Sequence, residues 1–254
     1  MAKIIDDKPR PTIKDRVNTA VGDVQGGDRV LAGVRLWPDG ARTNLLVAGD
    51  RIDNITDWSL DQFRKYYQPG RGKKDRPITK EAIFHYVYGV LHDPVYREKY
   101  ALNLKREFPR IPFYPDFWKW AGWGERLMDL HLNYETVEPY PLDIQTLKVS
   151  ETFRVLPRLI ARKDQGLIEV DTITTLRGVP SAAWDYRLGT YTALEWILER
   201  YKEKTPKDPT IREKFNTYRF ADYKEQVIDL LQRVCTVSVE TMKVIGQMPT
   251  DSTI

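Results

Sequence analysis

A turn that ends in glycine, residues 163–166 (KDQG), separates two β-branched stretches in the middle of this chain. The stretches cover residues 153–162 and 167–176, and a glycine that supplies a positive φ at the end of such a turn is typical of an antiparallel hairpin. Ile168 and Val170 alternate with polar residues, as in a sheet that is exposed to water on one face. The middle of the chain therefore predicts a small antiparallel sheet.

Both sides of this hairpin show the apolar spacing of helices. Capping signals and periodicity predict helices that begin at Thr56 or Asp57, Thr79, Asp93, Asp116, Tyr191 and Asp222. Pro109, Pro112 and Pro115 exclude a helix just before Asp116. The predicted fold class is α+β, mostly helical with a small antiparallel sheet in the middle.

The first 43 residues differ from the rest, because their apolar residues are sparse and aperiodic. We expect a loosely ordered lead-in over 1–43, with a hairpin at 30–48 around Pro38-Asp39-Gly40. Residues 44–254 are predicted to form one domain, of which 44–248 folds as a single cooperative unit.

Composition places the chain among folded proteins of a reducing compartment. The 254 residues include 40 Lys and Arg against 36 Asp and Glu, a net charge of +4 that by itself indicates no nucleic-acid partner. The single cysteine, Cys235, cannot form an internal disulfide. The sequence has neither a run of about 18 apolar residues nor the apolar core of a signal peptide at its N-terminus. We expect a cytoplasmic protein without membrane contact.

Catalytic motifs are missing from the sequence. It contains no phosphate-binding loop, no Gly-x-Gly-x-x-Gly turn and no tetrapeptide of the amino-methyltransferases. The histidines His85, His92 and His131 allow two interpretations, a metal pair on one helical face or half-buried side chains that bond a helix end or a carboxylate. No cysteine or chelating glutamate accompanies them, which favours the second. We predict a non-catalytic chain without a metal site or cofactor.

Three basic clusters are the candidate DNA-binding residues. We assign phosphate contacts to Arg71, Lys73, Lys74 and Arg76, to Arg154, Arg158 and Lys163, and to Lys207, Arg212, Lys214 and Arg219. Even spacing places Arg154, Arg158 and Arg162 on one strand face. If the three clusters share one surface, the positive charges gather on that surface and the acidic residues lie elsewhere, although the net charge is small.

Rigid turns supply the candidates for reading bases. Arg162 and Gln165 lie at the 163–166 turn, while Arg177 and Arg187 flank Gly178-Val179-Pro180. The commonest sequence-specific contact between a protein and DNA is a pair of hydrogen bonds from arginine to guanine, and a two-stranded β-ribbon fits the major groove. The alternative is that Arg162 and Arg187 form surface ion pairs with Asp164 or Asp185, which contribute little.

Several strings of the sequence resemble a known family. They include ITKEAIFHYVYGVLH at 78–92, WDYRLG at 184–189 and VCTVSVETM at 234–242, with further segments at 96–100, 103–112, 130–135, 138–142 and 193–196. Together, from about 44 to 248, they resemble the C-terminal target-recognition domain of type ISP restriction–modification enzymes. Residues 1–43 match weakly or not at all.

The resemblance implies that recognition and catalysis belong to different domains. In that family a nuclease, a helicase-like ATPase, a coupler and an N6-adenine methyltransferase precede this domain. S-adenosylmethionine, ATP and Mg are accordingly expected only in those other domains, whether they belong to the same polypeptide or to a separate subunit. The implied function is sequence-specific recognition of double-stranded DNA. The alternative is a docking module that packs on the methyltransferase or helicase without reading bases.

Overall fold

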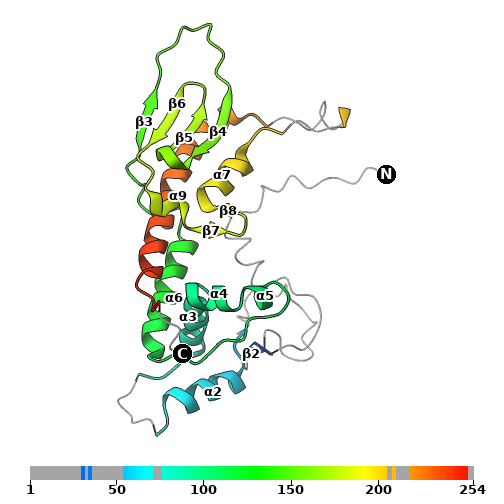
Figure 1. The fold of residues 1–254 in the computed structure, drawn as a ribbon, viewed down its shortest axis with the longest axis vertical. Helices are drawn as coiled ribbons and strands as arrows, with labels where there is room; N and C mark the ends of the chain where they lie inside the picture. The colour runs from blue at the N-terminus through cyan, green and yellow to red at the C-terminus, as the bar shows by residue number, and fades with distance from the viewer. Residues whose placement is uncertain are drawn as a thin grey trace, which may run out of the picture. The chain divides into compact units, whose positions relative to one another are not determined.

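The computed structural model describes residues 54–70, 76–204, 208–209 and 218–250, together with the backbone of two short strands, β1 (Val30–Leu31) and β2 (Val34–Arg35). The chain divides into two compact units, residues 1–132 with 250–254 and residues 133–249 (Figure 1). The α+β class predicted from the sequence is confirmed, and each unit is described below by itself.

The first unit is helical. It contains α2 (Asp57–Tyr67), α3 (Lys80–Val90), α4 (Pro94–Lys99), α5 (Ala101–Leu104) and α6 (Phe117–Leu132). The predicted caps are confirmed, because the side chains of Thr56, Thr79 and Asp93 accept hydrogen bonds from the first turns of α2, α3 and α4. In β1 and β2, Leu31 pairs with Val34, whereas the turn predicted at 38–40 lies outside the described residues.

Two glycines allow α3 and α6 to pack closely. A Cβ at Gly124 would overlap the backbone carbonyl O of His85, and one at Gly89 would lie 2.6 Å from the carbonyl O of Trp120. Only hydrogen atoms fit at these two points, so the helix backbones approach each other directly. The closeness of this helix pair is a feature that apolar periodicity does not predict.

Tyrosine hydroxyls hold the proline-containing segment that precedes α6. Tyr86 is fully buried; its hydroxyl donates to the carbonyl O of Pro112 at 2.7 Å and accepts from the backbone N of Tyr114 at 2.6 Å. The hydroxyl of Tyr67 donates to the carbonyl O of Tyr114 at 2.6 Å. Backbone groups that cannot form helical bonds next to prolines are satisfied in this way.

The second unit is built on a four-stranded antiparallel sheet of order β3-β6-β5-β4. Its strands are β3 (Asp143–Thr146), β4 (Pro157–Arg162), β5 (Leu167–Asp171) and β6 (Thr174–Arg177). Figure 1 shows β3 and β4 at the two edges of the sheet, joined by a long loop. The predicted hairpin turn is confirmed as the short 3-10 helix η1 (Lys163–Gln165), followed by Gly166 at a φ of 61°.

Helices accompany one face of this sheet. They are α7 (Ala193–Tyr201), which begins with a capping box between Thr192 and Glu195, and α9 (Lys224–Ile245). A second hairpin, β7 (Arg187–Leu188) with β8 (Tyr191–Thr192), and the short 3-10 helices η2 (Ser181–Trp184) and η3 (Phe220–Tyr223) complete the unit. Ile168, Val170 and Leu176 are fully buried on the helix side of the sheet.

Two sequence predictions about this unit are wrong in detail. Residues 167–176 form two strands instead of one, because the carboxylate of Asp171 accepts from the backbone N of Ile173 and Thr174 and turns the chain. Asp222 lies in η3 and does not cap α9, whose N-cap position is Tyr223 without a side-chain hydrogen bond.

Candidate nucleic-acid interface

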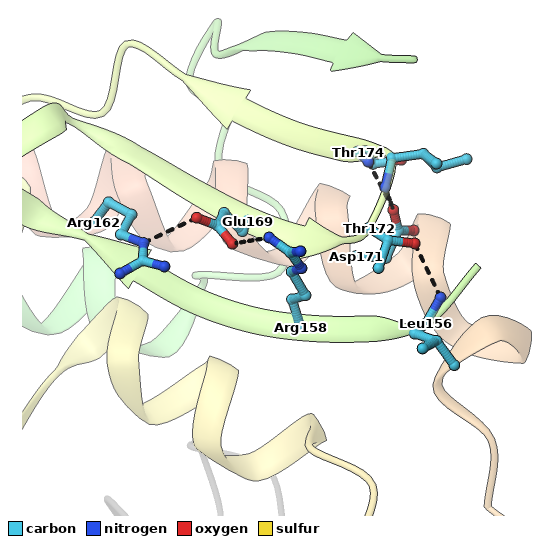
Figure 2. Close-up of polar contacts among 8 residues, drawn as sticks. Leu156, Arg158, Arg162, Glu169, Asp171, Thr172 and Thr174 are labelled. Carbon is cyan, nitrogen blue, oxygen red and sulfur yellow. Dashed lines mark hydrogen bonds and ion pairs between the residues drawn. The ribbon is translucent and has the colours of Figure 1, made fainter. Parts of the chain in front are cut away.

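The face of the sheet opposite Ile168, Val170 and Leu176 carries three of the predicted arginines. Arg158 and Arg162 both contact Glu169 of the neighbouring strand, with Nη1 to Oε2 at 2.8 Å and Nε to Oε1 at 2.9 Å (Figure 2). They therefore share one face, as their even spacing predicts. Arg177 lies on the same face, because the register aligns it with Leu167 and aligns Leu167 with Arg162.

The ion pairs leave the two arginines of β4 partly open to solvent. The side chains of Arg158 and Arg162 are 50% and 45% exposed, against 19% for Glu169. Hydrogen bonds first from Arg158 and then from Arg162 hold the pKa of Glu169 below its usual range, so its carboxylate stays charged at neutral pH. The sum of these three groups is one positive charge. The predicted surface pair of Arg162 with Asp164 is wrong in its partner, which is Glu169.

The other base-reading candidates divide into two locations. Gln165 is exposed on η1, beside the end of β4 that carries Arg162. Arg177 ends β6, and its Nε donates to Oε1 of Gln145 on β3 at 2.7 Å. Arg187 lies on the separate β7–β8 hairpin, where its Nη2 donates to the carbonyl O of Thr190 instead of pairing with Asp185. The sheet thus gathers three of the four candidates at its η1 end.

The phosphate candidates are more scattered. Arg71, Lys73, Lys74, Lys207, Arg212 and Lys214 lie outside the described residues, so a common surface for the three clusters stays a prediction. Arg76 stacks on the ring of Trp118, 3.9 Å from its centroid, and Lys163 pairs with Glu195 at 2.8 Å. Arg219 donates from Nη1 to the carbonyl O of Tyr218. Arg154 is exposed and precedes β4, which begins at Pro157, so it does not lie on the strand face predicted for it with Arg158 and Arg162.

Sequence reasoning missed the partners that hold these arginines. Glu169 and Gln145 were not among the candidates, although the period-two pattern places Glu169 on the exposed face of the predicted strand. An apolar segment around the β3–β4 loop was not predicted either. Its large side chains are between 37% and 64% exposed; they are Ile144, Leu147, Val149, Phe153, Val155, Leu156 and Ile160.

The histidine cluster is structural. Nδ1 of His92 bonds the carbonyl O of Tyr88 at 2.8 Å near the end of α3, as the second interpretation of the histidines predicts, and Nδ1 of His131 bonds the Tyr88 hydroxyl at 2.7 Å. Burial lowers the pKa of His131 to about 3. Within the described ranges, no three His, Cys, Asp or Glu side chains gather in a metal-binding cluster. Across those same ranges, no helix has the length and apolar character that a bilayer crossing requires.

Comparison with known proteins identifies the family. The family model of the Type ISP C-terminal specificity domain matches residues 20–230, so the chain belongs to this family of specificity domains. The match begins well before residue 44, where the resemblance in the sequence begins. A comparison with curated proteins found no match.

Three solved structures resemble the chain over most of its length. A DrdV–DNA complex solved by cryo-electron microscopy is 54% identical over 81% of this chain, with a TM-score of 0.74. A nuclease-deletion mutant of the Type ISP restriction–modification enzyme LlaGI, in complex with a DNA substrate mimic, is 31% identical over 69%, with a TM-score of 0.54. The ATP-dependent Type ISP enzyme LlaBIII bound to DNA is 26% identical over 83%, with a TM-score of 0.59. The chain spans only 21%, 14% and 13% of these three proteins.

Proposed function

We propose that this specificity domain recognises a sequence of double-stranded DNA for a Type ISP restriction–modification enzyme. The observation that carries the proposal is the sheet face on which Arg158, Arg162 and Arg177 are exposed, in a chain whose family model covers residues 20–230. Half-exposed guanidinium groups on a rigid sheet suit both phosphate contacts and base-edge contacts. The DNA-bound state of the three solved relatives supports the same partner.

Chemistry is assigned to other domains. A specificity domain selects the site, while adenine methylation and ATP-dependent nuclease action belong to the remainder of the enzyme, which would also hold S-adenosylmethionine, ATP and Mg. The methyltransferase and helicase-like domains are thus the protein partners, in one polypeptide or as separate subunits. This domain would contribute affinity through backbone phosphates and discrimination through a few base contacts.

The salt dependence of DNA binding tests this proposal. A variant with Arg158, Arg162 and Arg177 all changed to alanine should bind duplex DNA more weakly than the unchanged protein. If some of these residues bind phosphates, the slope of log affinity against log salt should fall by about one unit for each phosphate that the variant no longer neutralises. A matched control is Lys202→Ala. Lys202 is an exposed cation away from the sheet, and its Nζ pairs with Oε2 of Glu199 on α7 at 2.8 Å. Equal behaviour of the two variants would contradict the proposed face.

Docking onto other domains is a second function with an observation of its own. The apolar side chains around the β3–β4 loop include Leu147, 64% exposed, and Phe153, 46% exposed. Apolar surface gathered on one segment favours contact with another protein surface. A double variant, Leu147→Ser with Phe153→Ser, should weaken association with the methyltransferase while the base preference of the assembled enzyme stays unchanged. A change in base preference without loss of association would assign this loop to DNA instead.

A further inference from the structure

Two arginines of the sheet face are held in the same way. The Nε of Arg162 donates to Oε1 of Glu169 at 2.9 Å, and the Nε of Arg177 donates to Oε1 of Gln145 at 2.7 Å. In both cases the acceptor lies on an adjacent strand. Each guanidinium is thus held by the N–H nearest its stem, and neither of its terminal nitrogens is used for that bond.

The register places these two units side by side. Arg162, Leu167 and Arg177 form one cross-strand row, and Ile160, Glu169, Thr175 and Gln145 form the row of their acceptors. Because Arg162 and Arg177 are two strands apart, their backbones are separated by about 10 Å. That separation lies within the width of a major groove, which is about 12 Å.

The acceptors are themselves held in position. Glu169 uses its second carboxylate oxygen for Nη1 of Arg158 at 2.8 Å, and Nε2 of Gln145 donates to Oδ2 of Asp143 at 2.7 Å. The bond to Asp143 fixes which end of the Gln145 amide faces Arg177. Within the part of the chain that the structure describes, the terminal nitrogens of Arg162 and Arg177 have no partner.

We propose that Glu169 and Gln145 are positioning residues that orient Arg162 and Arg177 to read guanine bases through their terminal nitrogens. The inference rests on the proposed function and adds the class of base that is read. Two parallel N–H donors match the O6 and N7 acceptors of guanine, and this match is lost when the guanidinium rotates. Glu169 and Gln145 do not touch DNA in this arrangement.

The test compares Glu169→Ala with Asp164→Ala in a Type ISP enzyme that carries this domain. Both changes remove one negative charge from the hairpin of β4, η1 and β5, but Asp164 is exposed on η1 and accepts from neither arginine. Affinity should be measured for the recognised duplex, for duplexes with each guanine replaced in turn, and for an unrelated duplex.

For Glu169→Ala we expect the preference for guanine to fall about tenfold or more at one position, while affinity for the unrelated duplex does not fall. Asp164→Ala should keep the preference at every position. A second variant, Gln145→Leu, should lose preference at a different guanine, which keeps the test decisive if Glu169→Ala folds poorly. Glu169→Gln keeps one oxygen acceptor and should retain more preference than Glu169→Ala.

The Arg162→Ala and Arg177→Ala variants separate the positioning role from the proposed function. If these variants lose preference but Glu169→Ala and Gln145→Leu keep it, the positioning role is overturned and the proposed function stands. If none of the four variants changes base preference or affinity, the proposed DNA face itself is wrong. A loss of affinity for all duplexes alike in Glu169→Ala also overturns the positioning role.

Discussion

The helical unit and the sheet of the second unit use polar groups in opposite ways. In the helical unit, the hydroxyls of Tyr67 and Tyr86 donate hydrogen bonds to backbone carbonyl groups of the segment before α6. On the sheet face, Arg162 and Arg177 each use one N–H for a neighbour and keep their terminal nitrogens. The difference separates polar groups that hold the fold together from polar groups that are available to a partner.

The largest effect should come from Gly124→Ala. A methyl group there collides with the backbone carbonyl of His85, which cannot rotate away, so α3 and α6 must separate. We expect the free energy of unfolding of the helical unit to fall by roughly 3 kcal/mol or more, measured by hydrogen exchange of α3 and α6 amides.

Gly122→Ala is the matched control on the same helix. A Cβ at Gly122 meets nothing within 4 Å, so alanine there should be neutral or stabilise α6 by about 1 kcal/mol. If the two substitutions cost the same, the close approach of α3 and α6 is not what holds the helical unit.

Acid should destabilise the two units at different pH values. Burial lowers the pKa of His92 and lowers that of His131 to about 3, so folding disfavours the charged form of both histidines. The unfolded chain binds protons at these histidines below pH about 6.5, so stability falls as pH drops from there, and the contribution of His131 continues to fall to about pH 3. The slope should reach up to about 1.4 kcal/mol per pH unit for each histidine.

The sheet should resist acid further. Arg158 and Arg162 lower the pKa of Glu169. Burial raises the pKa of Asp171, but the bonds from Lys224, Ile173 and Thr174 together outweigh burial and lower it. These groups stabilise the fold above their unfolded pKa values of 4.5 and 3.8, and their contribution is lost as pH falls through the folded values. Hydrogen exchange at pH 5 should show weakened α3 and α6 amides and an intact sheet. Loss of both units together at one pH would argue for the single cooperative unit predicted for 44–248.

A smaller effect is expected for Tyr86→Phe. The ring still fills its buried site, but the carbonyl O of Pro112 and the backbone N of Tyr114 lose their partner. Leaving buried backbone groups unsatisfied should cost about 1–3 kcal/mol in the helical unit, measured by urea unfolding. Tyr66→Phe changes a tyrosine that is 58% exposed and serves as the control, with an expected change near zero.

Local signals predicted much of the fold. Thr79 and Asp93-Pro94 mark helix starts, and Gly166 marks the hairpin turn, because capping and positive φ depend on a few adjacent residues. The division of residues 167–176 into β5 and β6 was missed. This division depends on the carboxylate of Asp171, which accepts a hydrogen bond from the backbone N of Thr174 at the turn. The same carboxylate also pairs with Lys224, from a helix that is distant in the sequence.

The candidate site was predicted only in part, for a related reason. Sequence spacing placed Arg158 and Arg162 on one face, but their shared partner Glu169 follows from strand register, which spacing does not fix. Arg177 reaches Gln145 across thirty-two positions of the chain, through a strand that sequence reasoning did not predict. Long-range pairing therefore decides which arginine nitrogens are bonded within the sheet and which are not.

The most direct test of base reading by the sheet face is to map which DNA sites a Type ISP enzyme methylates. The enzyme would carry Arg162→Ala or Arg177→Ala in this domain, and Lys202→Ala would serve as the control. We predict that each arginine variant relaxes the choice at one guanine position, at a cost of roughly 1–3 kcal/mol, and leaves the other positions intact. The enzyme that carries Lys202→Ala should methylate only the original sites. Unchanged site choice in both arginine variants, with a uniform loss of affinity, would contradict base reading and reduce the sheet face to phosphate contacts.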